Sequence, residues 1–188
     1  MRILLLDNYD SFTWNLYHVL AQHAPVEVLR NDAITVDEAA RYPRIVISPG
    51  PGLPREAGIT MALLHALLPT HPILGVCLGM QALVEACGGA LYNQQRVRHG
   101  VAVPCLPGEP RDALFAGLPA PFDAGLYHSW AADEARLPPA LRVTARSAEG
   151  VVMAVRHAQH PACGVQFHPE SVLTPHGPRI LANWLATA

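Results

Sequence analysis

The stretch that decides the fold is Ile73-Leu74-Gly75-Val76-Cys77-Leu78-Gly79-Met80-Gln81. It begins as a short apolar run, which predicts a buried strand over 73–77, and a helical pattern follows over 79–87. Glycines two residues before and two residues after Cys77 are typical of a tight strand-to-helix turn, known as a nucleophile elbow. Such a turn lifts the cysteine side chain to the carboxyl end of the sheet, where α/β proteins bind their ligands.

Three more apolar runs lack polar alternation and predict strands buried on both faces of a parallel sheet. They lie at 3–6, 26–29 and 45–47. Helical patterns separate most of the runs: one could be capped by Asp10 or Ser11 and extends to about residue 22, and another covers 56–68. This alternation of strands and helices predicts an α/β sandwich.

After Gly88-Gly89 the pattern changes to short β-like pieces divided by proline, glycine and aspartate. They lie at 98–106, 141–147, 151–156 and 163–167, and a last helix is expected at about 178–185. No repeat or low-complexity linker marks a domain boundary. The sequence therefore predicts one α/β domain over residues 1–188, with a central, mostly parallel sheet flanked by helices and with additional antiparallel strands in the C-terminal half.

Composition excludes several classes of function. Thirteen Lys and Arg stand against fifteen Asp and Glu without charge runs, which leaves no basic surface for a nucleic acid or an anionic membrane. The N-terminus reaches Asp7 after four apolar residues, too few for a signal peptide, so we expect a cytoplasmic protein. The four cysteines form no Cys-x-x-Cys pair, so neither disulfides nor a zinc site are favoured.

Cys77 is the candidate nucleophile. The dipole and the free N–H groups of the following helix would favour its thiolate. On spacing alone a buried structural cysteine is equally well supported, because free cysteine is among the most buried residue types. Cys87, Cys105 and Cys163 lack the elbow and keep the structural interpretation.

A proton acceptor for this thiol is offered by His168, at the end of an apolar run. Pro169 favours extended geometry in the preceding residue, and residues two apart in an extended chain point the same way. Glu170 could therefore hold the imidazole, as the third member of a triad does. Taken alone, a His-Pro-Glu loop more often reflects turn chemistry or a surface ion pair.

The loop Ser48-Pro49-Gly50-Pro51-Gly52-Leu53-Pro54 follows the third strand, at the same sheet edge as Cys77 if the strands are parallel. Its glycines allow close backbone approach, and such a loop can aim a backbone N–H, here that of Gly52, at the oxyanion of a tetrahedral intermediate. The N–H of Leu78 would be the second donor. Without the cysteine, a rigid connector would be the preferred interpretation of this loop.

Taken together, these motifs resemble the class I, triad-type glutamine amidotransferases, specifically the glutaminase subunits of anthranilate synthase and aminodeoxychorismate synthase. The similarity covers essentially the whole chain. It rests on the segments Asp7-Asn8-Tyr9-Asp10-Ser11-Phe12-Thr13, Ser48-Pro49-Gly50-Pro51-Gly52, Gly75-Val76-Cys77-Leu78-Gly79-Met80-Gln81, Tyr127-His128-Ser129 and Gln166-Phe167-His168-Pro169-Glu170-Ser171.

The resemblance implies that Cys77 attacks the amide carbon of glutamine, that His168 shuttles protons and that Glu170 orients it. A thioester forms and water releases it, so the products are glutamate and ammonia. The glutamine pocket would be lined by Gly50, Pro51, Gly52, Gln81, Ser129 and Trp130. The resemblance implies no cofactor or metal in this chain.

The implied partner is a chorismate-binding synthase subunit that consumes the ammonia in a heterodimer or larger complex, with magnesium bound only by that subunit. Residues 8–17 and 30–33 look more like the aminodeoxychorismate type, and residues 152–157 look closer to the anthranilate type. We favour aminodeoxychorismate synthase, with anthranilate synthase, or a protein shared by both, as the alternative.

Three positions depart from the family pattern: Leu126 stands where relatives usually have Arg, Trp130 where they have Leu, and Val101 where they have Lys. We hypothesise that the loss of two cations alters partner docking. Two other functions compete with the leading one. A catalytically silent regulatory subunit is disfavoured by the intact triad residues, and a stand-alone cysteine hydrolase or peptidase is disfavoured by the glutamine-pocket motifs.

Overall fold

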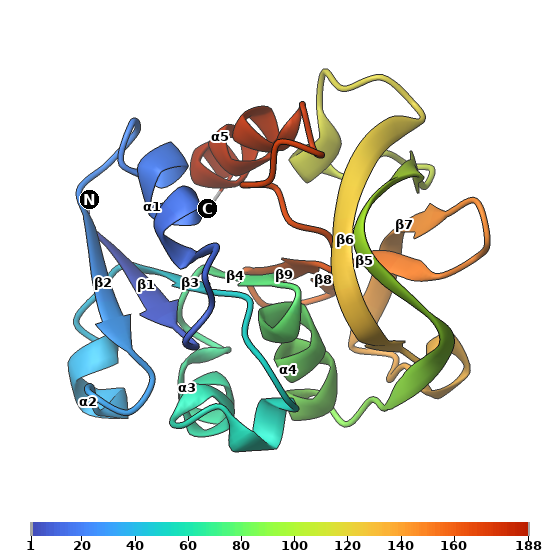
Figure 1. Ribbon diagram of the computed structural model, residues 1–188. Coiled ribbons are helices and arrows are strands. Elements are labelled where there is room, and N and C mark those ends of the chain that lie inside the picture. Colours follow the sequence, from blue (N-terminus) through green and yellow to red (C-terminus); the bar gives the residue numbers. More distant parts are fainter. Residues whose placement is uncertain (1, 188) are drawn as a thin grey trace.

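The computed structural model describes residues 2–187, with the side chains of 95–98 outside the description. The described residues form one nine-stranded sheet in the order β2-β1-β3-β4-β9-β8-β7-β5-β6 (Figure 1). The strands are β1 Ile3–Asp7, β2 Val26–Arg30, β3 Arg44–Ile47, β4 Ile73–Val76, β5 Leu91–Pro107, β6 Phe122–Ala132, β7 Leu141–Ser147, β8 Val152–His157 and β9 Ala162–Val165.

The sheet has two halves. Pairing is parallel from β2 through β9 and antiparallel from β9 onward to β6. Because a parallel pair needs a crossover connection, the first half carries most of the helices. This arrangement confirms the predicted central, mostly parallel sheet with antiparallel strands in the C-terminal half.

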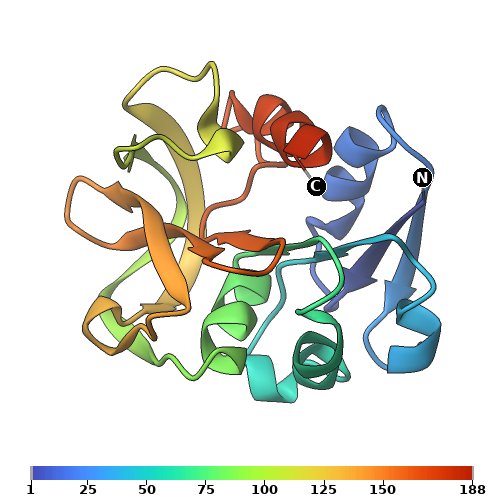
Figure 2. The same ribbon diagram turned by 180° about the vertical axis from the view of Figure 1, so that it is seen from behind.

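Helices cover both faces of the parallel half. Figure 1 shows α1 and α5 on one face and α2, α3 and α4 on the other, and Figure 2 shows the same division from behind. Their bounds are α1 Thr13–Leu20, α2 Val36–Ala39, α3 Thr60–Leu67, α4 Leu78–Ala86 and α5 Gly177–Thr187. Among the described helices, none has both the length and the apolar character needed to cross a membrane.

Strand β1 shows how sequence alternation builds two cores. Ile3 and Leu5 join the cluster that also contains α1 and α5 side chains, whereas Leu4 and Leu6 join the cluster beneath α3 and α4. Successive side chains of a strand point to opposite faces, so an unbroken apolar run is what a strand covered on both sides requires. All four residues are fully buried.

The structure corrects four details of the expected elements. Strand β2 is the edge of the sheet and only partly buried, so it is not covered on both faces as predicted. Helix α1 begins at Thr13 with Phe12 as its N-cap, and neither Asp10 nor Ser11 caps it. The helix expected over 56–68 is a 3-10 turn, Pro54–Glu56, followed by α3. Strand β6 and the short α2 were not predicted.

Candidate active site

The carboxyl edge of the parallel strands brings the candidate nucleophile and its candidate base together. Cys77 follows β4 and His168 lies three residues beyond the end of β9, and these two strands are parallel neighbours with Val76 opposite Val165. The backbone N–H of Cys77 donates to the carbonyl of Val165 at 2.8 Å. The register therefore places two residues that are distant in the sequence at one point of the sheet edge.

The turn at Cys77 has the strained geometry expected of an elbow. Its φ is +51°, a left-handed value that non-glycine residues rarely adopt. A Cβ on Gly75 would lie 2.4 Å from the carbonyl of Gly79, and one on Gly79 would lie 2.4 Å from the carbonyl oxygen of Ile47. Both glycines are therefore required by backbone contacts on either side of the turn.

His168 and Glu170 form a buried pair. Nδ1 of His168 donates to Oε1 of Glu170 at 2.7 Å, and the two side chains are 3% and 0% exposed. Within the described residues, Oε2 of Glu170 has no hydrogen-bond partner. A buried carboxylate with one free oxygen is costly unless a positive charge lies next to it, so this pair favours the imidazolium form of His168.

Opposing effects set the charge of His168. Burial lowers the pKa of the imidazole, but hydrogen bonding and charge at Cys77 and Glu170 outweigh it and raise the pKa to about 10. Nε2 of His168 is buried and, among the described residues, makes no hydrogen bond of good geometry. The second nitrogen is thus held near the thiol but remains unengaged, as is common in active sites without substrate.

Two aromatic rings, which the sequence did not single out, fix the plane of the imidazole. Phe12 and Tyr127 contact the His168 ring at centroid distances of 5.2 and 4.8 Å, both in edge-type geometry. The hydroxyl of Tyr127 is hydrogen-bonded to Ser171 Oγ at 2.9 Å. His168 is therefore held by ring packing as well as by Glu170.

The loop after β3 is anchored by a buried polar network around Asn8. The Asn8 side-chain amide donates to the Ser48 carbonyl at 3.0 Å, and its oxygen accepts from Asn31 and from the Thr60 hydroxyl. A Cβ on Gly50 would lie 2.6 Å from the Cβ of Asn8. The network fixes the loop that carries Gly52, one of the two predicted oxyanion donors.

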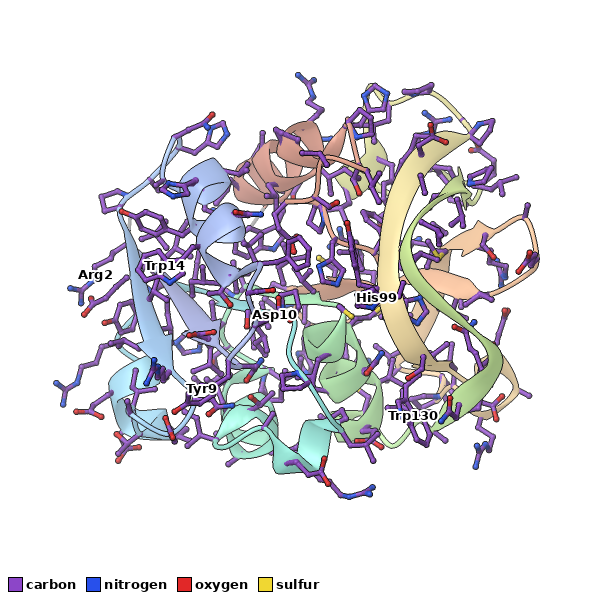
Figure 3. All side chains as sticks on the ribbon, in the orientation of Figure 1. Arg2, Tyr9, Asp10, Trp14, His99 and Trp130 are labelled. Carbon is purple, nitrogen blue, oxygen red and sulfur yellow. The ribbon has the colours of Figure 1, made fainter. Side chains whose placement is uncertain are left out.

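A pocket of about 200 Å³ opens beside Cys77. It is lined by Gly50, Pro51, Gly52, Cys77, Gln81, Tyr127, His128, Ser129 and Trp130. All six residues predicted for a glutamine pocket lie here, and Tyr127 and His128 were missed. Leu78, the other predicted oxyanion donor, directly follows Cys77 and opens α4, where the first N–H groups have no intrahelical partner. Figure 3 shows Trp130 and His99 along the long strands β5 and β6, to the right of α4 in that view.

His128 is a neutral residue inside this wall. Its Nδ1 lies 2.8 Å from the carbonyl oxygen of Trp130, so Nδ1 must carry the proton and Nε2 the lone pair. Burial lowers the pKa of His128 to about 4, and the hydrogen bond to Trp130 only partly offsets this effect. The nearby positive charge of His168 lowers the pKa further.

An acid-dependent loss of stability follows from the lowered pKa. Between about pH 6.5 and about pH 4 the unfolded chain binds a proton at His128 that the folded chain does not, so stability falls as pH falls through this interval, by up to about 3 kcal/mol. Urea unfolding at several pH values should show a shallower acid slope for His128→Gln than for the parent. His23→Gln, at an exposed position, is the matched control, and equal slopes for parent and His128→Gln would contradict the prediction.

The departures from the family pattern have different surroundings. Val101 is 38% exposed, whereas Leu126, its partner on the neighbouring strand, is 3% exposed and belongs to the core. Leu126 also lines a separate cavity of about 220 Å³ that contains none of the predicted site residues. Of these two positions, only Val101 is therefore placed to meet a partner directly. An arginine at 126 would first have to escape burial.

No group of three or more His, Cys, Asp or Glu side chains in the described chain is arranged to hold a metal ion. The other cysteines differ from Cys77 in their surroundings. Burial raises the pKa of the Cys105 thiol strongly and that of Cys163 to about 12, and it also raises that of Cys87. None of these three lines the pocket.

Comparison with known proteins gives a consistent result. A family model described as glutamine amidotransferase class-I matches residues 4–188. The anthranilate synthase component 2 of Mycobacterium tuberculosis is 47% identical, with 98% of this chain and 82% of that protein covered. The aminodeoxychorismate synthase component 2 of Klebsiella aerogenes is 46% identical, with 97% of this chain and 98% of that protein covered.

Two further matches differ in what they show. The bifunctional protein TrpGD of Thermotoga maritima is 43% identical over 98% of this chain, which spans only 32% of that protein. The crystal structure of a Thermoplasma acidophilum protein, provisionally assigned as part of a GMP synthase, has a TM-score of 0.87, covers 99% of this chain and 92% of its own, and shares the fold at 24% identity. With a family model over nearly its full length and relatives 46–47% identical to it, the chain belongs to the class-I glutamine amidotransferase family.

Proposed function

We propose that this chain hydrolyses L-glutamine to glutamate and ammonia and delivers the ammonia to a chorismate-aminating synthase subunit. The observation that carries the proposal is the position of Cys77. It stands on a strained turn at the mouth of the pocket, beside an imidazole that is buried against a carboxylate. Family membership supplies the amide substrate, and the geometry supplies a nucleophile and an acid.

In the proposed reaction the thiolate of Cys77 adds to the side-chain amide carbon of glutamine. The N–H groups of Gly52 and Leu78 stabilise the resulting oxyanion, and His168 protonates the departing ammonia. The raised pKa of His168 suits this step, because the imidazolium is the form that donates the proton. Water deprotonated by His168 then cleaves the thioester and releases glutamate.

Substrate binding is assigned to the pocket beside Cys77. Gly50, Pro51 and Gly52 form one side, and Ser129 and Trp130 form the other. Gln81 also lines the pocket, although its Nε2 already donates to the Trp130 carbonyl at 2.8 Å. Its side-chain oxygen is therefore the group we assign to the substrate, as an acceptor for the ammonium end of glutamine.

For the synthase partner we propose aminodeoxychorismate synthase, with anthranilate synthase, or service to both, as the alternative. The segments 8–17 and 30–33 support the first, and relatives with both names match almost equally well. In this proposal the chain is one domain in the cytoplasm without a cofactor of its own, and magnesium is bound by the partner with chorismate.

Reconstitution with each type of synthase subunit tests the proposal. With glutamine, chorismate and magnesium, we expect glutamate release that increases when the correct partner is added, together with a para-aminated product for the favoured partner or an ortho-aminated product for the alternative. Absence of glutamate release with either partner would favour a catalytically silent subunit. Full activity on varied amides without any partner would favour a stand-alone hydrolase.

A further inference from the structure

A second buried side chain reaches the sulfur of Cys77. Gln166 follows β9 directly, is fully buried, and its Nε2 donates to Cys77 Sγ at 3.6 Å, within the range of hydrogen bonds to sulfur. Among the described residues this sulfur is the only acceptor recorded for that amide group. The backbone N–H of Gln166 donates to the Met153 carbonyl at 2.8 Å, which anchors the residue to β8.

The hydrogen-bond network fixes which end of the Gln166 amide faces the sulfur. A carbonyl oxygen can only accept, so the group of Gln81 that lies 2.8 Å from the Trp130 carbonyl must be the Nε2 donor. The same Nε2 lies 3.3 Å from the Gln166 side chain, which must therefore present its oxygen there. The remaining end of Gln166, the N–H₂ group, is thereby directed at Cys77.

We propose that Gln166 is a catalytic residue that stabilises the thiolate of Cys77 by donating a hydrogen bond to the sulfur, and that Gln81 is a positioning residue that orients it. This inference rests on the proposed function and adds a group to it. A hydrogen bond to a charged acceptor is stronger than one to a neutral acceptor, so the amide favours the thiolate over the thiol.

The same bond acts again late in the reaction. In the thioester the sulfur carries no charge, and hydrolysis returns it to the thiolate as the leaving group. A donor already aimed at the sulfur stabilises that developing charge without reorganisation. Gln166 would therefore assist both the formation of the nucleophile and the cleavage of the intermediate.

Alkylation of Cys77 by iodoacetamide across about pH 5 to about pH 9 measures thiolate formation independently of glutamine turnover. The alkylated site is read by peptide mass spectrometry, with Cys77→Ser as the background. In Gln166→Met, which lacks the donor, we expect the midpoint of the rate profile to rise by about one pH unit and the rate below it to fall about tenfold. Gln166→Glu, which presents a carboxylate to the sulfur, should shift the profile further.

Gln81→Met should shift the profile in the same direction by a smaller amount, because Gln166 keeps its donor but loses its orientation. Gln22→Glu, at an exposed position, is the matched control and should leave the profile unchanged. Urea unfolding identifies variants that do not fold. If Gln166 variants fail to fold, Gln81→Met decides the question, and an unchanged profile in that variant overturns the proposal.

The outcomes separate this inference from the proposed function. An unchanged alkylation profile in folded Gln166→Met and Gln166→Glu means that the amide is only a satisfied buried group, whether or not glutamine is hydrolysed. A shifted profile in a protein that releases no glutamate supports the role of Gln166 in thiolate formation and contradicts the proposed glutaminase function.

Discussion

Replacing Cys77 with serine should lower glutamine hydrolysis by at least about 10⁴-fold, because the nucleophile of the proposed reaction is lost. A serine hydroxyl needs a neutral base to remove its proton. His168 cannot serve, since contact with Glu170 and the site charge keep its pKa well above neutrality. Glutamate release by the purified complex with its synthase partner is the measurement.

Two controls make the Cys77→Ser result specific. Synthesis by the same complex with added ammonia should continue at close to the parental rate, because ammonia bypasses this site. Cys87→Ser, which changes a thiol outside the pocket, should retain glutamine-dependent activity. Glutamate turnover in Cys77→Ser close to that of the parent would disprove the assignment of the nucleophile.

Replacing Gly79 with alanine should destabilise the protein by about 3 to 5 kcal/mol. The added Cβ would lie 2.4 Å from the carbonyl oxygen of Ile47, and that atom belongs to a central strand that cannot move aside cheaply. Any shift of β3 or α4 would also displace the turn at Cys77. The free energy of unfolding in urea measures the effect.

Gly108→Ala is the matched control for this substitution. A Cβ there would have its nearest contact at 3.6 Å, and the residue is not among the glycines with positive φ. We expect a change within about 0.5 kcal/mol for this variant. A similar small change in Gly79→Ala would mean that the turn can relax, and that glycine is not required beside the nucleophile.

Much of the fold was predictable because its parallel half obeys simple rules. Apolar runs at β1, β3 and β4 are buried on both faces, and this is the pattern that distinguishes central strands. Strand β6 escaped prediction because Gly125 and the polar residues after it interrupt any regular alternation, and its partner β5 contains register shifts. The short α2 did carry a signal, the capping box of Thr35 and Glu38.

The candidate site was only partly visible in the sequence. Cys77 and His168 stand in local motifs whose chemistry can be reasoned from neighbouring residues. The contacts of Gln166 with Cys77 and of Phe12 with His168 depend instead on strand register and on ring packing across the sheet edge. No periodicity or spacing encodes such contacts, so only the three-dimensional structure reveals them.

The pocket combines two regions of the sheet with different constraints. Cys77 and His168 extend from the central strands β4 and β9, whereas residues 127–130 come from β6, the last strand of the antiparallel half. A strand at the border has one neighbour instead of two, so its sequence can drift without disturbing the middle of the sheet. Over evolutionary time, descendants of such a protein can retune which small molecule they admit while inheriting an unaltered reactive centre.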